Sequence, residues 1–205
     1  MTAPASRQLI IFARAPHYGA VKTRLAAEIG SAAAWRAYRA MTDATLRAVA
    51  TSPTWSTRLA VTPPAAVFRG RHWPDAVERM PQAKGDLGRR MGLALAAGTR
   101  AGPTVIVGSD IPEMTAGHIQ RAFDLLGRHD VVFGPATDGG YWLVGVRHGL
   151  PIAAVRCLFD GVRWSSVTAL SDTVENVPAG WRIGYATTLS DIDTAADLAT
   201  WMARV

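Results

Sequence analysis

Residues 9–25 read Leu-Ile-Ile-Phe-Ala-Arg-Ala-Pro-His-Tyr-Gly-Ala-Val-Lys-Thr-Arg-Leu, an apolar run followed by a basic loop and the start of a helical pattern. Open α/β sheets bind anionic ligands at such positions, outside the carboxyl ends of their strands. The spacing matches neither the Walker loop nor the dinucleotide fingerprint. The loop therefore predicts a phosphate-bearing ligand held by the side-chain charges of Arg14, Lys22 and Arg24, with Gly19 allowing close backbone approach. A solvated basic loop in front of a helix is the alternative.

The rest of the chain alternates apolar runs with helical patterns. The clearest buried strand is Thr104–Gly108, which no charge interrupts. Further strands are predicted at residues 9–13, 58–62, 76–80, 131–133, 141–146 and 182–186, and helices at 32–50, 85–97, from Thr115 onward and at 194–202. This alternation predicts an α/β fold with helices on both faces of a mostly parallel sheet, and residues 131–146 predict one antiparallel insertion. We expect a single domain over residues 1–205, since no linker or repeat interrupts the pattern.

Composition and charge exclude several classes of function. The 205-residue chain has a formal net charge of +6, but its basic residues form no long block, which argues against a nucleic-acid partner. No apolar run approaches the ~20 residues of a membrane helix, and the N-terminus lacks a secretory apolar stretch. We therefore expect a cytoplasmic protein without membrane insertion. The single cysteine, Cys157, cannot form an internal disulfide, and we expect it to pack in the core beside Leu158 and Phe159.

Two acidic residues follow predicted strands. Asp110 comes directly after the buried strand Thr104–Gly108, and Asp193 precedes the last predicted helix. Mg²⁺ binds through one or two protein carboxylates and then bridges to substrate phosphates, so these residues predict a site for Mg²⁺ or Mn²⁺. The alternatives are a turn residue at Asp110 and a helix-stabilising acid at Asp193.

Two further segments are candidates for substrate contact. Asp138-Gly139-Gly140-Tyr141 lies between two predicted strands, where Asp138 could orient or deprotonate an acceptor hydroxyl and the aromatic rings could stack on a sugar or base. An Asp-Gly hairpin turn explains the same residues. Asp86, between two glycines at a predicted helix start, is a candidate for contact with the nucleotide, although helix capping also accounts for it.

Four motifs in order resemble a bacterial group of glycosyltransferase-like proteins. They are Phe-Ala-Arg-Ala-Pro-x-x-Gly-x-Val-Lys-Thr-Arg-Leu at 12–25, Gly-Asp-Leu-Gly-x-Arg-Met at 85–91, Gly-Ser-Asp-Ile-Pro at 108–112 and Gly-Pro-Ala-x-Asp-Gly-Gly-Tyr-Trp-Leu-x-Gly at 134–145. Many members of the group have been known as a domain of unknown function, and some as arsenosugar-biosynthesis-associated glycosyltransferases. The resemblance implies the GT-A fold of nucleotide-diphospho-sugar transferases, with a bound nucleotide and a divalent metal.

The same resemblance implies roles for individual residues. Arg14, Lys22 and Arg24 match the phosphate-facing loop, and Asp138 with its glycines matches the acceptor-side turn. Asp110 falls where GT-A proteins place a metal-binding acid, although it stands in Ser-Asp-Ile-Pro and not in Asp-x-Asp. Asp193 lies in Asp-Ile-Asp-Thr, which is similar to the closing metal-side motif of related nucleotidyltransferases.

The leading hypothesis is a metal-dependent transferase that moves a group from a nucleotide-activated donor, a nucleotide sugar, to a small-molecule acceptor. The layout is also similar to 2-phospholactate guanylyltransferase and the molybdopterin nucleotidyltransferases. The second hypothesis is therefore a nucleotidyltransferase that uses a nucleoside triphosphate and releases pyrophosphate. A non-catalytic nucleotide-binding protein is the third, because fold alone does not decide the chemistry.

Overall fold

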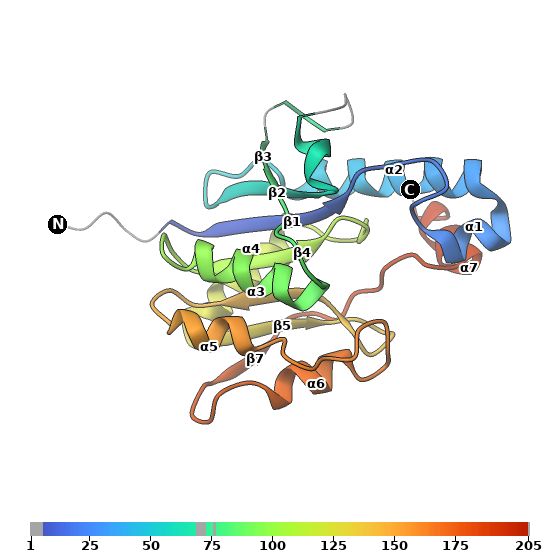
Figure 1. Ribbon diagram of the computed structural model, residues 1–205. Coiled ribbons are helices and arrows are strands. Elements are labelled where there is room, and N and C mark those ends of the chain that lie inside the picture. The colour runs from blue at the N-terminus through green and yellow to red at the C-terminus, as the bar shows by residue number, and fades with distance from the viewer. Residues whose placement is uncertain (1–5, 69–72, 76, 205) are drawn as a thin grey trace.

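A computed structural model describes residues 6–68, 73–75 and 77–204, and its centre is one seven-stranded sheet (Figure 1). The strands lie in the order β3-β2-β1-β4-β6-β5-β7. Their bounds are β1 Gln8–Arg14, β2 Ser56–Thr62, β3 Glu78–Pro81, β4 Thr104–Gly108, β5 Val131–Pro135, β6 Tyr141–Val146 and β7 Ile183–Tyr185. Of these seven strands, β6 alone runs antiparallel to its neighbours, β4 and β5. The prediction of a mostly parallel sheet with one antiparallel insertion is confirmed.

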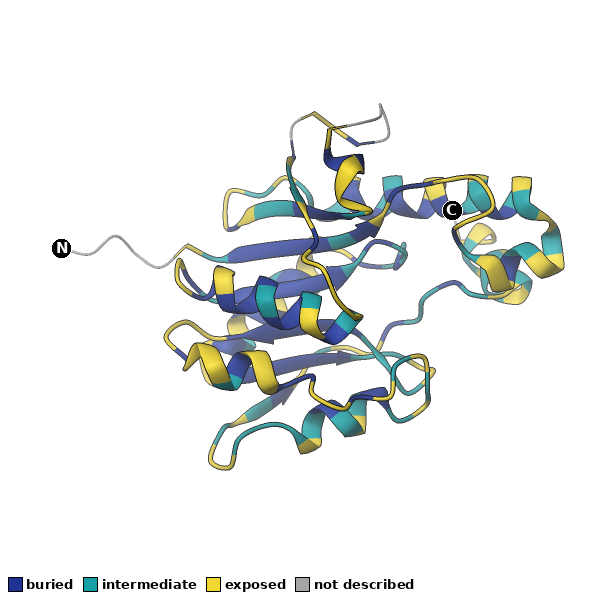
Figure 2. Cartoon of the chain, viewed as in Figure 1, coloured by how far each residue is buried: buried dark blue, intermediate teal, exposed yellow. Residues whose placement is uncertain are grey.

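Helices cover both faces of the sheet. Their bounds are α1 Thr23–Ile29, α2 Ser31–Val49, a 3₁₀ turn at Pro64–Val67, α3 Leu87–Gly98, α4 Ala116–Leu126, α5 Ile152–Cys157, α6 Ala169–Glu175 and α7 Ala195–Met202. Side chains of α2 and α4 share one core with Leu9 and Ile11, and side chains of α3 and α5 share the other with Ile10. Successive residues of a strand point to opposite faces, so β1 contributes to both cores. Figure 2 shows the resulting buried central strands beneath partly exposed helices.

Most predicted elements are present, with shifted ends. Asp86 has an extended backbone and accepts a hydrogen bond from the Arg89 N–H, so α3 begins at Leu87 and not at residue 85. Thr115 and Thr194 begin α4 and α7 with capping boxes, in which each hydroxyl accepts from the backbone N–H three residues farther on. Of the strand expected at 76–80, Ala76 lies outside the described residues, and β3 occupies Glu78–Pro81.

The expectation for Cys157 is wrong. Cys157 is the last residue of α5 and is exposed, whereas Val155 and Leu158 are fully buried. Residues three apart share a face of a helix, so the two apolar residues direct that face inward and leave Cys157 on the outer side. Among the helices of the described residues, none combines the length and the apolar character needed to cross a membrane.

Candidate active site

The acidic residues meet where three parallel strands end. Asp110 follows β4, Asp138 follows β5, and the segment after β7 carries Asp191 and Asp193. A parallel bridge between Ala136 and Leu189 extends the β5–β7 pairing toward these loops. All four carboxylates line one cavity of about 660 Å³, which the loop after β1 closes on another side. The sheet thus gathers residues that are up to 83 positions apart, as the carboxyl edge of an α/β fold does.

Lys22 lies between the two predicted metal ligands. Its Nζ is 2.7 Å from Asp110 Oδ2 and 2.7 Å from Asp193 Oδ1, and 7% of its side chain is exposed. The backbone of Lys22 is left-handed, with φ 46°, at the position directly before α1. Burial lowers the pKa of Lys22, but the two carboxylates outweigh burial and hold the pKa above its usual value. The ammonium is therefore charged and is held between the two carboxylates.

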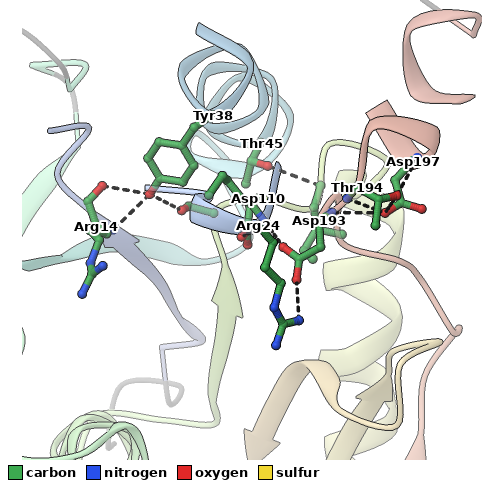
Figure 3. Close-up of polar contacts among 11 residues, drawn as sticks. Arg14, Arg24, Tyr38, Thr45, Asp110, Asp193, Thr194 and Asp197 are labelled. Atoms are coloured by element: carbon green, nitrogen blue, oxygen red, sulfur yellow. Dashed lines mark hydrogen bonds and ion pairs between the residues drawn. The ribbon is translucent and has the colours of Figure 1, made fainter. Parts of the chain in front are cut away.

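The other two predicted phosphate ligands differ in position. Arg24 Nη1 is 3.5 Å from Asp193 Oδ2, and 71% of the Arg24 side chain is exposed, so it can move toward a ligand (Figure 3). Arg14 lies apart from this pair, and its guanidinium donates to the carbonyl of Ala20 at 3.0 Å. The hydroxyl of Tyr38 fixes the Arg14 backbone, because it donates to the Arg14 carbonyl at 2.8 Å and accepts from its N–H at 3.1 Å. The phosphate contacts of these side chains stay predictions.

Asp191 is a site residue that the sequence reasoning missed. Burial is the main cause that raises its pKa, to about 6; Lys22 opposes the rise, and the carboxylates of Asp193, Asp110 and Asp138 add to it. The sequence signal is the pattern Asp191-Ile192-Asp193, and the structure buries Ile192 with 4% exposure. An acid on each side of a buried apolar residue indicates two carboxylates that face the same way.

The Asp138 turn is longer than a two-residue hairpin. Residues 136–140 join β5 to β6, and the Asp138 carboxylate accepts from the Gly140 N–H at 2.9 Å. Gly139 has φ 88°, and a Cβ there would lie 2.2 Å from the carbonyl oxygen of Val167. Gly139 therefore permits the turn to pack directly on the segment before α6. Tyr141 is half-buried in the cavity wall, whereas the Trp142 indole is buried and donates to the Thr187 carbonyl at 3.0 Å.

Asp86 is not brought into this cavity. It caps α3 and lines a second hollow of about 470 Å³ between α3 and α5, while its neighbour Leu87 lines the main cavity. The helix cap by itself accounts for Asp86, and the contact of Asp86 with a nucleotide stays a prediction.

The carboxylates fit a small divalent cation. Asp110 and Asp193 each place an oxygen within hydrogen-bonding distance of the same ammonium, so both point at one location that a cation already favours. Carboxylate oxygens are the ligands that Mg²⁺ and Mn²⁺ prefer. Within the described residues no group of three or more His, Cys, Asp or Glu side chains is arranged around a metal position. Two carboxylates are sufficient where substrate phosphates and water complete the coordination.

Solved structures share this fold. A provisionally assigned nucleotide-diphospho-sugar transferase from Desulfovibrio desulfuricans G20 is 28% identical, with a TM-score of 0.82 over 95% of this chain and 85% of the other. A cytidylyltransferase from Leptospira borgpetersenii is 14% identical, with a TM-score of 0.62 over 96% and 84%. Rv0371c from Mycobacterium tuberculosis H37Rv, in complex with manganese, is 14% identical, with a TM-score of 0.58 over 98% and 100%.

Sequence comparison identifies the family directly. Among curated proteins, none is significantly similar in sequence to this chain. The α/β fold predicted from the sequence is that of the nucleotide-diphospho-sugar transferase neighbour, which confirms the predicted architecture. A family model described as "uncharacterized protein conserved in bacteria (DUF2064)" matches residues 45–166, more than half of the sequence, and the chain therefore belongs to this family.

Proposed function

We propose that this protein is a metal-dependent transferase that uses a nucleotide-activated donor, with a nucleotide sugar as the leading donor. The observation that carries the proposal is the Asp110–Lys22–Asp193 arrangement, in which two carboxylates and a cation converge beside the predicted phosphate loop. The similar proteins from D. desulfuricans and L. borgpetersenii are named as a nucleotide-diphospho-sugar transferase and a cytidylyltransferase, which supports a nucleotide-using transferase. The manganese complex of Rv0371c supports the use of a divalent metal.

We assign each of these residues a role according to its charge. Asp110 and Asp193 would hold Mg²⁺ or Mn²⁺, which, when bound, offsets negative charge on the donor phosphates. Lys22 has a flexible four-carbon stem, so its ammonium can move from the carboxylates to a phosphate oxygen. Lys22 and Arg24 would then stabilise the leaving nucleotide by preorganised positive charge, with Arg14 farther along the donor. Asp138 would orient the attacking hydroxyl of the acceptor or accept its proton.

A nucleotidyltransferase is the second candidate, because a cytidylyltransferase shares the fold and Asp110 stands in Ser-Asp-Ile-Pro. The two reactions break different bonds. Transfer of a sugar releases a nucleoside diphosphate, whereas nucleotidyl transfer consumes a nucleoside triphosphate and releases pyrophosphate. Product analysis therefore separates them.

The test is a thermal-shift screen of nucleotide sugars against nucleoside triphosphates, with Mn²⁺ or with EDTA, followed by product analysis. Binding to the folded state raises Tm by mass action. We expect a metal-dependent shift with nucleotide sugars that Asp110→Asn abolishes. The matched control is Asp75→Asn, which removes an exposed carboxylate outside the cavity. An unchanged metal dependence in Asp110→Asn would refute the metal assignment, and tight binding without turnover would favour the non-catalytic alternative.

A further inference from the structure

One wall of the cavity is formed by segments other than those that carry Asp110, Lys22 and Asp193. It consists of Tyr141 at the start of β6 and residues 164–167, which precede α6, and we term it the acceptor wall. In Figure 1, α1 lies next to α7, well beyond the end of β1, whereas the segment leading into α6 lies near β5. In the proposed function, the donor phosphates lie beside Lys22, and the acceptor wall contacts the second substrate.

The aromatic rings of the acceptor wall are held in place. The ring centroids of Tyr141 and Trp164 are 6.3 Å apart at 68°, an edge-to-face contact. Thr173 Oγ1 donates to the Tyr141 hydroxyl at 3.3 Å. Trp164 also packs against α3, where a Cβ on Gly88 would lie 2.9 Å from its Cζ2 atom. Both side chains are half-buried, so each ring keeps an accessible surface while its orientation is fixed.

Backbone strain occurs on both sides of the same cavity. Throughout the described ranges, Lys22 and Ser165 are the two non-glycine residues with positive φ, at 46° and 57°. Both line this cavity. Such conformations are energetically costly and concentrate at functional sites. The strain at Ser165 presents its exposed side chain beside Trp164, just as the strain at Lys22 presents the ammonium to its carboxylates.

In the part of the chain that the structure describes, the acceptor wall carries no positive charge. The cationic side chains that line the cavity are Lys22 and Arg24, and both contact Asp193. Arg163, next in sequence to Trp164, does not line the cavity and is paired with Asp172 through two nitrogen–oxygen contacts of 2.7 and 3.0 Å. Four carboxylates line the cavity against two cations, so its formal charge is negative. A divalent cation and a donor diphosphate roughly cancel each other and leave this balance unchanged.

We infer that the acceptor of this enzyme is an uncharged, hydroxylated molecule with a ring face, such as a sugar, and that Tyr141 and Trp164 bind that face. The inference rests on the proposed function and adds the chemical class of its second substrate. An anionic acceptor would meet the carboxylates of Asp138 and Asp191, with no cation among the described residues of the wall to offset them, and like-charge contacts of this kind are strongly unfavourable. Apolar ring faces and hydroxyls match the aromatic rings and the exposed Ser165 side chain of the wall.

Acceptor binding can be measured without the donor. Saturation-transfer NMR on the full chain would compare glucose with glucuronate, galactose with galacturonate, and each neutral sugar with its phosphate ester. We expect signals from the neutral members that Trp164→Ala removes and Trp181→Ala, a half-buried tryptophan outside the cavity, preserves. Equal or stronger signals from the anionic members, or no signal from any neutral member, would overturn the inference.

Two variants that each introduce a positive charge test the preference for neutral acceptors in a turnover assay. Val167 is 79% exposed in the acceptor wall, and Phe68 is 89% exposed outside the cavity. With Mn²⁺ and a panel of UDP-, GDP- and dTDP-sugars, we expect at least about tenfold higher kcat/KM for neutral than for anionic acceptors. Val167→Lys should reduce that ratio at least about fivefold and Phe68→Lys should not, whereas equal effects of the two variants would contradict the inference. Absence of donor binding and donor consumption would instead refute the proposed function, and the NMR result would still decide the class of acceptor.

Discussion

Replacing Lys22 by Met tests the central arrangement of the site. The substitution keeps the length of the side chain but removes the ammonium, which lies 2.7 Å from an oxygen of Asp110 and of Asp193. Those two oxygens are therefore no farther apart than twice that distance. Two like charges about 5 Å apart repel by about 3 kcal/mol at an effective dielectric constant near 20. The carboxylate side chains are 30% and 35% exposed, so screening reduces the loss of stability to about 1–2 kcal/mol.

Thermal unfolding in EDTA measures this loss, and we expect the Tm of Lys22→Met to fall by about 2–8 °C for a chain of this size. Added Mn²⁺ should raise the Tm of Lys22→Met more than that of the unaltered protein, because the cation no longer competes with the ammonium. Lys84→Met, which removes an exposed lysine outside the cavity, is the matched control. A variant as stable as the parent in EDTA, or a Mn²⁺ shift no larger than that of the parent, would refute the reasoning.

Three further substitutions test how the fold holds the site. Gly139→Ala should lower the free energy of unfolding in urea by about 2–4 kcal/mol, because the residue has a φ of 88° and its Cβ would lie 2.2 Å from a carbonyl oxygen. The control is Gly149→Ala, which has a φ of 79° and open space around it and should lose only about 1 kcal/mol. Tyr38→Phe should lose about 1–2 kcal/mol by removing both hydrogen bonds to the Arg14 backbone, and Tyr185→Phe at an exposed ring should be neutral. Burial raises the pKa of Asp130, but hydrogen bonds from two arginines outweigh burial and lower that pKa. Asp130→Asn should therefore cost about 1–3 kcal/mol at pH 7, and the difference should shrink below about pH 4, as the carboxylate is protonated in the parent; a difference that is constant with pH would exclude this mechanism.

The sequence predicted the sheet well because its central strands are unbroken apolar runs. Thr104–Gly108 has no charge and is buried on both faces, so its assignment needed no tertiary information. The helices α5 and α6 were missed because six or seven residues are too few to establish a helical period. The helix α1 was not predicted as an element of its own either, because it is also seven residues long and is separated from α2 by Gly30 with φ 83°.

For the candidate site, the sequence predicted several of the contributing residues but not which of them contact one another. Asp110 was recognisable because it follows an apolar strand, and Asp193 because it precedes the last predicted helix. The position of the Lys22 ammonium depends on a left-handed backbone and on a partner 171 residues away, and neither leaves a local pattern. Of the acceptor wall, Tyr141 was predicted and residues 164–167 were overlooked, because these form an irregular segment without a local pattern.

The antiparallel direction of β6 has a consequence for how this enzyme can diversify. A parallel successor to β5 would need a crossover of a dozen or more residues, whereas here five residues return the chain to the sheet. Asp138 and Tyr141 thus lie in or next to a short turn that continues into a strand at each end, so the turn has little room for insertions. The segment between α5 and α6 joins two short helices at the surface and carries no sheet pairing. On the proposed function, the exposed side chains of Ser165 and Val167 are therefore the positions whose exchange retargets the enzyme to a new acceptor, while the backbone that supports the Asp138 turn at Gly139 is kept.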